Sequence, residues 1–211
     1  MTIDHPIFIQ SIRLIRAELG DTGLEPLQQA VLERLIHTSG DFGLQSCLQF
    51  SSGACEIGLA ALQRGAFILT DTLMAKSAVS PMACRTLKSK VHNVLDWAPQ
   101  TVPLTTTRTA EGMAVAWKEL SVHFENTQSP IVLIGSAPTA LERLLDLIAK
   151  DQYVPSLIIG MPVGFVGVAD SKKRLSLSGI PQIRLDGSRG GAALAAATVN
   201  TLLREAMRIK K

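Results

Sequence analysis

The chain has 211 residues, of which 46% are hydrophobic and 4% aromatic, and its formal net charge at pH 7 is +3. So small and scattered a charge argues against nucleic-acid binding, and the length fits one α/β domain over residues 1–211. No apolar run reaches the roughly twenty residues that span a membrane, and no signal-peptide pattern is present. The cysteines Cys47, Cys55 and Cys84 fit neither a disulfide framework nor a zinc site, which favours a cytoplasmic setting.

Two amphipathic helices are predicted at the start of the chain, over residues 6–19 and 25–36. The apolar positions of the first recur at helical spacing and are Phe8, Ile12, Ile15 and Leu19. Ser11 borders that apolar band, where a small residue allows close helix packing. His37 follows the second helix, and a cationic histidine is favoured at a helix carboxyl end. Local sequence therefore favours a capping role for His37 over a functional one.

A third helix, rich in Ala and Gly, is predicted over residues 51–64, and the first strand over residues 66–69. Asp71 and Thr72 follow this strand. Such residues cap helices, but a side chain at the carboxyl edge of a parallel sheet can also contact a ligand, and both readings stay open. A second strand is expected over residues 90–95, and residues 96–107 are rich in Pro and Thr and predict irregular structure.

Arg108 opens the next predicted helix, which covers residues 110–120. A cation in the first turn of a helix is poorly placed relative to the helix dipole. This makes Arg108 a candidate for function, although a solvated salt bridge would also explain it.

The stretch over residues 130–173 predicts strand, turn, helix and strand. Residues 131–134 and 157–159 are apolar runs without charge, as in parallel strands that are buried on both faces. The helix between them fits a right-handed βαβ crossover. Because ligands bind beyond the carboxyl ends of such strands, we expect function in the loops at 135–138 and 160–165.

A last strand is predicted over residues 181–185, followed by a Gly-rich loop and an Ala-rich helix to about residue 207. The loop could admit an anion to the helix start, but it matches no nucleotide-binding signature. Together the elements predict a doubly wound α/β domain with five parallel strands. The sequence shows no metal cluster and no G-x-S-x-G motif. The histidines, one of which could act as an acid or base, are scattered at His5, His37, His92 and His123.

Six segments of the chain, taken in order, resemble the precorrin-8X methylmutase family, including its cobalt-precorrin-8 relatives, along nearly the whole length. They are residues 33–38 with 40–42, 68–72 with Met74, 107–110, 134–141, 159–167 with 171–172, and a weaker match at 189–191. Two departures stand out. Position 136 is Ser where the family usually has Asn, and residues 96–106 hold more Pro and Thr than is typical.

The resemblance implies an isomerase of corrin (vitamin B12) biosynthesis that moves a methyl group on ring C of a tetrapyrrole. It would convert precorrin-8 or cobalt-precorrin-8 to hydrogenobyrinate or cobyrinate without a cofactor, any cobalt belonging to the substrate. It also implies a three-layer, flavodoxin-like fold with a five-stranded parallel sheet, N-terminal helices over the site, and a homodimer.

By the same resemblance His37 is the catalytic acid, and the substrate contacts are Ser11, Arg34, Thr72, Arg108, Ser136 and Gly164. A methyl shift within a conjugated ring requires no nucleophile, and a histidine can deliver a proton near neutral pH. Arginines suit the carboxylate arms of the macrocycle. Since fold does not fix function, two alternatives stay open: a carrier that binds a tetrapyrrole or nucleotide without turnover, and an acyl- or phosphate-handling enzyme.

Overall fold

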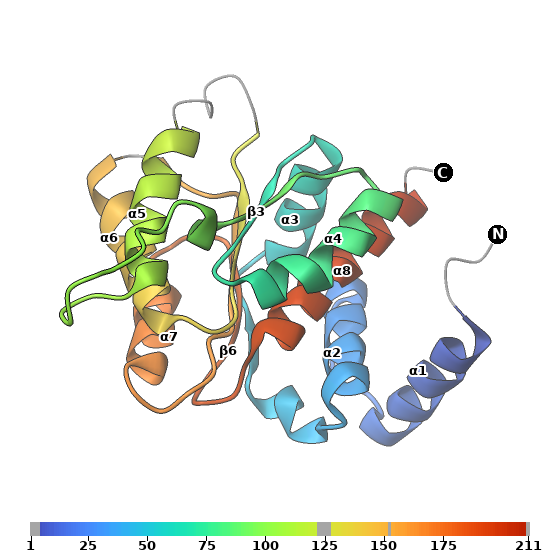
Figure 1. Cartoon of the computed structure of the whole chain (residues 1–211). Coiled ribbons are helices and arrows are strands. Elements are labelled where there is room, and N and C mark those ends of the chain that lie inside the picture. The colour runs from blue at the N-terminus through green and yellow to red at the C-terminus, as the bar shows by residue number, and fades with distance from the viewer. Residues whose placement is uncertain (1–4, 122–127, 152, 210–211) are drawn as a thin grey trace.

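The chain folds into three layers, with one sheet between two layers of helices (Figure 1). The computed structural model describes residues 5–121, 128–151 and 153–209. The helices are α1 (Pro6–Leu19), α2 (Pro26–Ser39), α3 (Ala54–Gln63), α4 (Leu73–Arg85), α5 (Arg108–Ser121), α6 (Pro138–Asp151), α7 (Val168–Ser176) and α8 (Ala192–Ile209), with 3-10 turns η1 (Phe42–Ser46) and η2 (Val94–Asp96). The strands are β1 (Leu48–Phe50), β2 (Ile68–Thr70), β3 (Val91–Asn93), β4 (Ile131–Ile134), β5 (Leu157–Gly160) and β6 (Gln182–Leu185).

The sheet has the strand order β1-β6-β5-β4-β2-β3. Strands β2 to β6 are parallel, as predicted, but the expectation of a five-stranded sheet was wrong, because β1 adds an antiparallel edge strand beside β6. Three residues with a central Gln49 are too short for a recognisable strand pattern. Because β2 pairs with both β3 and β4, the chain reverses its winding at β2, and the crevice where such folds usually bind ligands lies between β2 and β4.

The central strands are buried on both faces, which explains why they read as continuous apolar runs. Ile131 and Leu133 of β4 belong to the core cluster that α2, α3, α4 and α8 cover. The intervening Val132 belongs to the cluster on the other face, under α5, α6 and α7. The alternation follows from the two-residue period of a strand.

The N-terminal helices form largely as the sequence predicts. The bounds of α1 agree with the prediction, and α2 begins with Pro26 inside a capping box between Glu25 and Gln28. The second helix runs on to Ser39 and ends at Gly40, whose φ of 69° is left-handed. His37 therefore lies within the last turn of α2 rather than after it.

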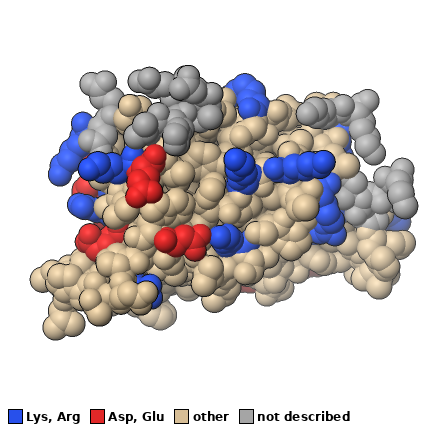
Figure 2. Space-filling model, turned by 45° about the horizontal axis from the view of Figure 1, so that its top comes forward, with Lys and Arg blue, Asp and Glu red and all other residues tan. Residues whose placement is uncertain are grey.

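Helix α4 was not predicted, because Pro81 lies in its interior and proline usually breaks a helix. It nevertheless packs along α8 in the layer that also contains α2 and α3. On the face shown in Figure 2, basic side chains gather over the half that carries α3 and α4, and acidic ones lie over the α5–α6 half, mixed with basic ones. Of the helices that the structure describes, none has the length and hydropathy to cross a membrane.

Helix α1 stands at one corner of the molecule, on the outer side of α2 (Figure 1). Its inner face contributes Ile15 to the core, while Ile7 and Leu14 are exposed. The pair α1–α2 therefore forms a projection whose outer surface is open to a ligand or to another chain.

Candidate active site

The imidazole of His37 is held by residues of α1. Its Nδ1 lies 2.7 Å from Ser11 Oγ, and its ring meets the Phe8 ring edge-on with 5.0 Å between the ring centroids. The carboxyl end of α2 is closed by Gly40, whose N–H donates to the carbonyl of Ile36. His37 is nevertheless the basic residue of the last turn of α2, the position that local sequence favoured for it. Within the described residues Nε2 has no partner, so this exposed nitrogen can face a ligand.

Arg34 sets the electrostatics around His37. Its guanidinium carbon lies 4.4 Å from the centroid of the Phe8 ring, in cation–π geometry. Burial lowers the pKa of Arg34. Partial removal from water and the Arg34 charge both lower the pKa of His37. Both effects favour the neutral imidazole in the empty protein, and a negative charge placed near Arg34 would favour its protonation.

The carboxylate of Asp71, which follows β2, is buried against the loop that follows β4. It accepts the backbone N–H groups of Gly135, Ser136 and Ala137 at 3.0, 2.6 and 2.9 Å. Burial raises the pKa of Asp71, and the three N–H donors oppose that rise. The amino end of α6, which would otherwise attract an anion, is therefore closed by the protein's own carboxylate.

Thr72 caps a different helix. Its Oγ1 accepts the N–H of Ala75 at 3.4 Å, at the start of α4, and lies 3.3 Å from Asp71 Oδ1. The capping reading thus holds for both residues. Ser136 keeps only its hydroxyl for a ligand, because its N–H is bound to Asp71.

The loops after β5 and β6 pack tightly against each other. Gly164 has a φ of +142°, which favours glycine, and its N–H donates to the Ser188 carbonyl at 3.1 Å. A Cβ on Gly190 would lie 2.1 Å from the carbonyl oxygen of Met161, so only glycine fits there. The backbone of these loops is fixed by internal contacts.

Lys172 of α7 stabilises the loop that follows β6. Its buried Nζ donates to the carbonyls of Gly187 and Arg189 at 2.8 and 2.6 Å. Burial lowers the pKa of Lys172 to about 8. Arg189 in turn donates to the Gly43 carbonyl and lies 3.4 Å from the carboxylate of Asp41, which follows α2. This chain of contacts connects the loop after β6 to the segment that directly follows the His37 helix.

The predicted site residues fall into two groups. His37, Ser11 and Arg34 meet across α1 and α2, and within the described residues no hydrogen bond joins His37 to the loops at the sheet edge. Thr72, Ser136 and Gly164 lie on the loops at the carboxyl edge of the sheet, as predicted.

Arg108 stands apart from both groups. It opens α5, is exposed, and donates to the Pro99 carbonyl at 3.0 Å. It forms no ion pair with any carboxylate that the structure describes, so the salt bridge considered from the sequence is absent there. Its charge is available to a ligand.

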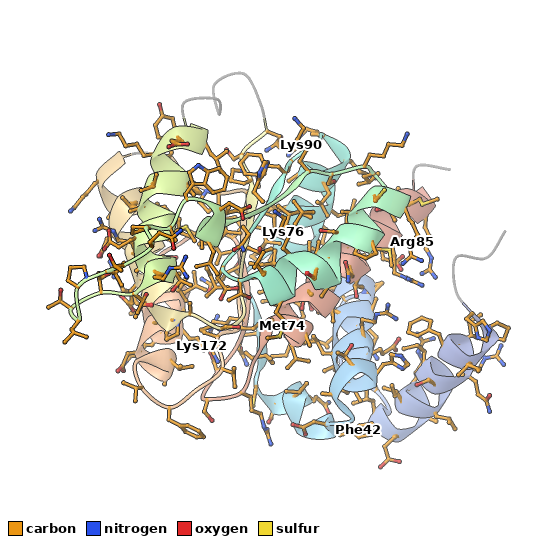
Figure 3. The ribbon with its side chains drawn as sticks, viewed as in Figure 1. Phe42, Met74, Lys76, Arg85, Lys90 and Lys172 are labelled. Atoms are coloured by element: carbon orange, nitrogen blue, oxygen red, sulfur yellow. The ribbon has the colours of Figure 1, made fainter. Side chains whose placement is uncertain are left out.

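Apolar side chains are exposed along the carboxyl edge of the sheet. They are Phe42, Leu73, Met74, Val163, Phe165 and Val166, of which Phe165 is 96% and Val166 89% exposed. Figure 3 shows Phe42, Met74 and Lys172 around this edge, where α4 and η1 begin. So much exposed apolar surface is typical of a binding or interaction surface.

Sequence reasoning missed the role of Phe8, which contacts both His37 and Arg34, and the bonding role of Lys172. The apolar band of α1 gave no sign that one of its side chains would pack against both a histidine and an arginine of α2. Lys172 could have been singled out, because a lysine on the buried face of a helix requires partners.

Comparison with known proteins identifies the architecture. The sequence profile of the family described as "Precorrin-8X methylmutase" matches residues 6–205. Similar proteins include a precorrin-8X methylmutase of Pseudomonas aeruginosa, 38% identical with 94% of each chain covered, and a cobalt-precorrin-8 methylmutase of Synechocystis, 34% identical with 98% of each chain covered. A crystal structure of precorrin-8x methyl mutase from Thermus thermophilus aligns with a TM-score of 0.84 and 34% identity, covering 96% of this chain and 98% of that one.

Proposed function

Because the chain belongs to the precorrin-8X methylmutase family, and is an isomerase that moves a methyl group in cobalamin biosynthesis, we propose that His37 is the acid of that reaction. The observation that supports this most is the Ser11–His37 contact at 2.7 Å. It fixes the imidazole through Nδ1 and leaves Nε2 exposed toward a ligand.

The proposed reaction needs only a proton donor and a macrocycle that is held in the right orientation. Nε2 of His37 protonates the conjugated macrocycle, the bond from the methyl group to the alpha carbon of ring C breaks, and a bond to the neighbouring beta carbon forms. The proton then returns to His37, so the product is an isomer of the substrate. The product would be hydrogenobyrinate from precorrin-8, or cobyrinate from its cobalt form, and the cobalt would be part of the substrate. We propose no cofactor.

The negative charge of the substrate would favour the protonated form of His37. The Arg34 charge lowers the pKa of His37 in the empty protein. A carboxylate arm of the macrocycle that pairs with Arg34 offsets this charge, so the pKa of His37 rises when substrate binds. His37 would then hold a proton when the macrocycle is in place.

The remaining predicted contacts would orient the ring. Arg108 supplies a second cation for a carboxylate, while Thr72 and Ser136 offer hydroxyl groups and Gly164 a close approach of the backbone. The exposed apolar side chains at the sheet edge suit the flat face of a macrocycle.

We further propose that the protein is a homodimer with a flavodoxin-like arrangement of its five parallel strands, and that it works in the cytoplasm. The exposed Ile7 and Leu14 on α1 support a partner chain there. The three cysteines are unpaired, which suits a reducing compartment.

Incubation of the purified protein with precorrin-8 tests this function. An enzyme should change the visible spectrum and release more of the new isomer than there is protein. A carrier would change the spectrum and release none. A phosphate-handling enzyme would ignore corrinoids and be inhibited by inorganic phosphate, an alternative that the closure of the α6 amino end by Asp71 disfavours.

A further inference from the structure

Phe8 lies outside both apolar cores of the protein. It is half-buried in the first turn of α1, and within the described residues it belongs neither to the two clusters of buried side chains nor to the apolar residues packed against them. Phenylalanine usually contributes to stability by packing in such clusters. The ring of Phe8 instead contacts a histidine and two arginines, which points to a role in holding those groups.

The spacing of residues along the two helices explains how these contacts arise. Phe8 and Ser11 are three residues apart on α1, and Arg34 and His37 are three residues apart on α2. Residues at this spacing lie on the same face of a helix. Because α1 packs along α2, the two pairs face each other, and the imidazole of His37 meets both Phe8 and Ser11.

The contact with Ser11 does not orient the imidazole by itself. It holds one ring atom, Nδ1, at 2.7 Å. The His37 side chain is exposed, and the torsion that turns a histidine ring about its Cβ–Cγ bond is broad. The Phe8 ring restricts this rotation, because it stands at 89° to the imidazole with 5.0 Å between the centroids, which is the edge-to-face arrangement that aromatic pairs prefer.

Phe8 holds the guanidinium of Arg34 as well. The Arg34 side chain has no hydrogen bond or ion pair within the described residues, and its guanidinium carbon lies 4.4 Å from the centroid of the Phe8 ring. Arg204 of α8 approaches the same ring, at 5.5 Å. The charge of Arg34 thus stays beside the imidazole, where it lowers the pKa of His37 together with burial.

We propose that Phe8 is a positioning residue of the methyl transfer, whose ring orients the imidazole of His37 and keeps the guanidinium of Arg34 beside it. This inference rests on the proposed function. A proton donor has to lie within hydrogen-bond reach of its acceptor, and a misplacement of about 1 Å can cost about 10²-fold in rate. An imidazole that turned freely about the Ser11 contact would present Nε2 to the macrocycle for only part of the time.

Turnover of precorrin-8 and nuclear magnetic resonance titration of His37 test the proposal together. Phe8→Leu removes the ring and Phe8→Tyr keeps it, while Phe50→Leu makes the same change at another half-buried position, on β1. Phe8→Leu should lower kcat about tenfold or more, with a smaller change in KM. It should also raise the pKa of His37, because the imidazole gains water and Arg34 is released. Phe8→Tyr and Phe50→Leu should match the wild type in both measurements.

Three results would overturn the proposal. A wild-type kcat in Phe8→Leu, or a pKa of His37 that does not rise, would show that the ring does not hold the acid. A Phe8→Tyr variant as impaired as Phe8→Leu would show that the aromatic contact is not what matters. An equal loss in Phe50→Leu would indicate general destabilisation.

Two further measurements keep the test decisive. Phe8→Met, which removes the ring at similar volume, takes the place of Phe8→Leu if that variant does not fold. Full turnover by His37→Ala would remove the proposed function, and this inference with it. Failure of this inference alone would look different, with His37→Ala inactive and Phe8→Leu as active as the wild type.

Discussion

The α1–α2 pair and the carboxyl edge of the sheet use their polar groups in opposite ways. At the sheet edge the Asp71 carboxylate, the Lys172 amine and the Gly164 N–H all bond to the protein's own backbone. On α1–α2, the Nε2 of His37 and the guanidinium of Arg34 have no polar partner within the described residues. The comparison indicates that internal hydrogen bonds hold the edge in place. Under the proposed function, the acid and one carboxylate-binding arginine lie on the helices that project beyond it.

Replacing His37 by Ala should have the largest effect. Loss of a general acid typically costs 10²- to 10⁴-fold in rate, and we expect turnover of precorrin-8 to fall by about that factor. Stability should change little, because the side chain is exposed. The rate is measured by the appearance of the isomer, and the thermal midpoint by circular dichroism. His92→Gln serves as the control and should retain turnover, whereas full turnover by His37→Ala would refute the assignment.

Asp71→Ala should show the reverse pattern, with a large loss of stability. The substitution leaves the N–H groups of Gly135 and Ala137 buried without an acceptor, at about 1–3 kcal/mol each. Urea unfolding should therefore give a free energy of unfolding that is lower by about 2–6 kcal/mol. Asp170→Ala, at an exposed position in the first turn of α7, is the control. An unchanged midpoint for Asp71→Ala would mean that these hydrogen bonds do not hold the edge in place.

Lys172 should make the free energy of unfolding depend on pH. Its pKa falls from 10.5 to about 8 on folding, because burial disfavours the charged form. Between these values the unfolded chain binds more protons than the folded one, so this group makes stability rise with pH. The neutral amine still has two N–H donors for the two carbonyls. Urea unfolding of the wild type and of Lys172→Met should diverge in favour of the wild type by up to about 3 kcal/mol between pH 8 and 10; parallel pH profiles would contradict this.

The smallest expected effect is a change in the pKa of His37, which tests the contact between Arg34 and His37 on the helices. Arg34→Gln should raise the pKa of His37, because a neighbouring cation is lost. Nuclear magnetic resonance titration of the His37 ring protons measures this shift, and His92 is the internal reference. A pKa of His37 that is unchanged or lower in the variant would show that Arg34 does not act on the imidazole.

Sequence periodicity predicted the bounds of α1 and four residues of β4 without error, because both are amphipathic or buried elements of ordinary length. It failed for β1, which is three residues long and antiparallel, and for α4, which contains Pro81. In both, tertiary packing outweighs the local signal. Such packing is outside the reach of pattern reasoning on a single chain.

The individual residues of the candidate site could be predicted from the sequence, but the contacts between them could not. Resemblance indicated His37 and Ser11 separately, yet the 2.7 Å contact depends on how α1 packs against α2. Arg204 could not be associated with Phe8, because α8 and α1 lie at opposite ends of the sequence. The closure of the α6 amino end by Asp71 follows from the pairing of β2 with β4, which the order of elements alone does not fix.

The most direct test of this division of roles between the sheet edge and the helices is a crystal structure of the protein with cobyrinate bound. We expect ring C to face Nε2 of His37, with Nδ1 still on Ser11, a carboxylate arm against Arg34, and Asp71 unchanged on its three N–H groups. A macrocycle seated with His37 turned to solvent, in its own subunit and in any partner, would contradict the account.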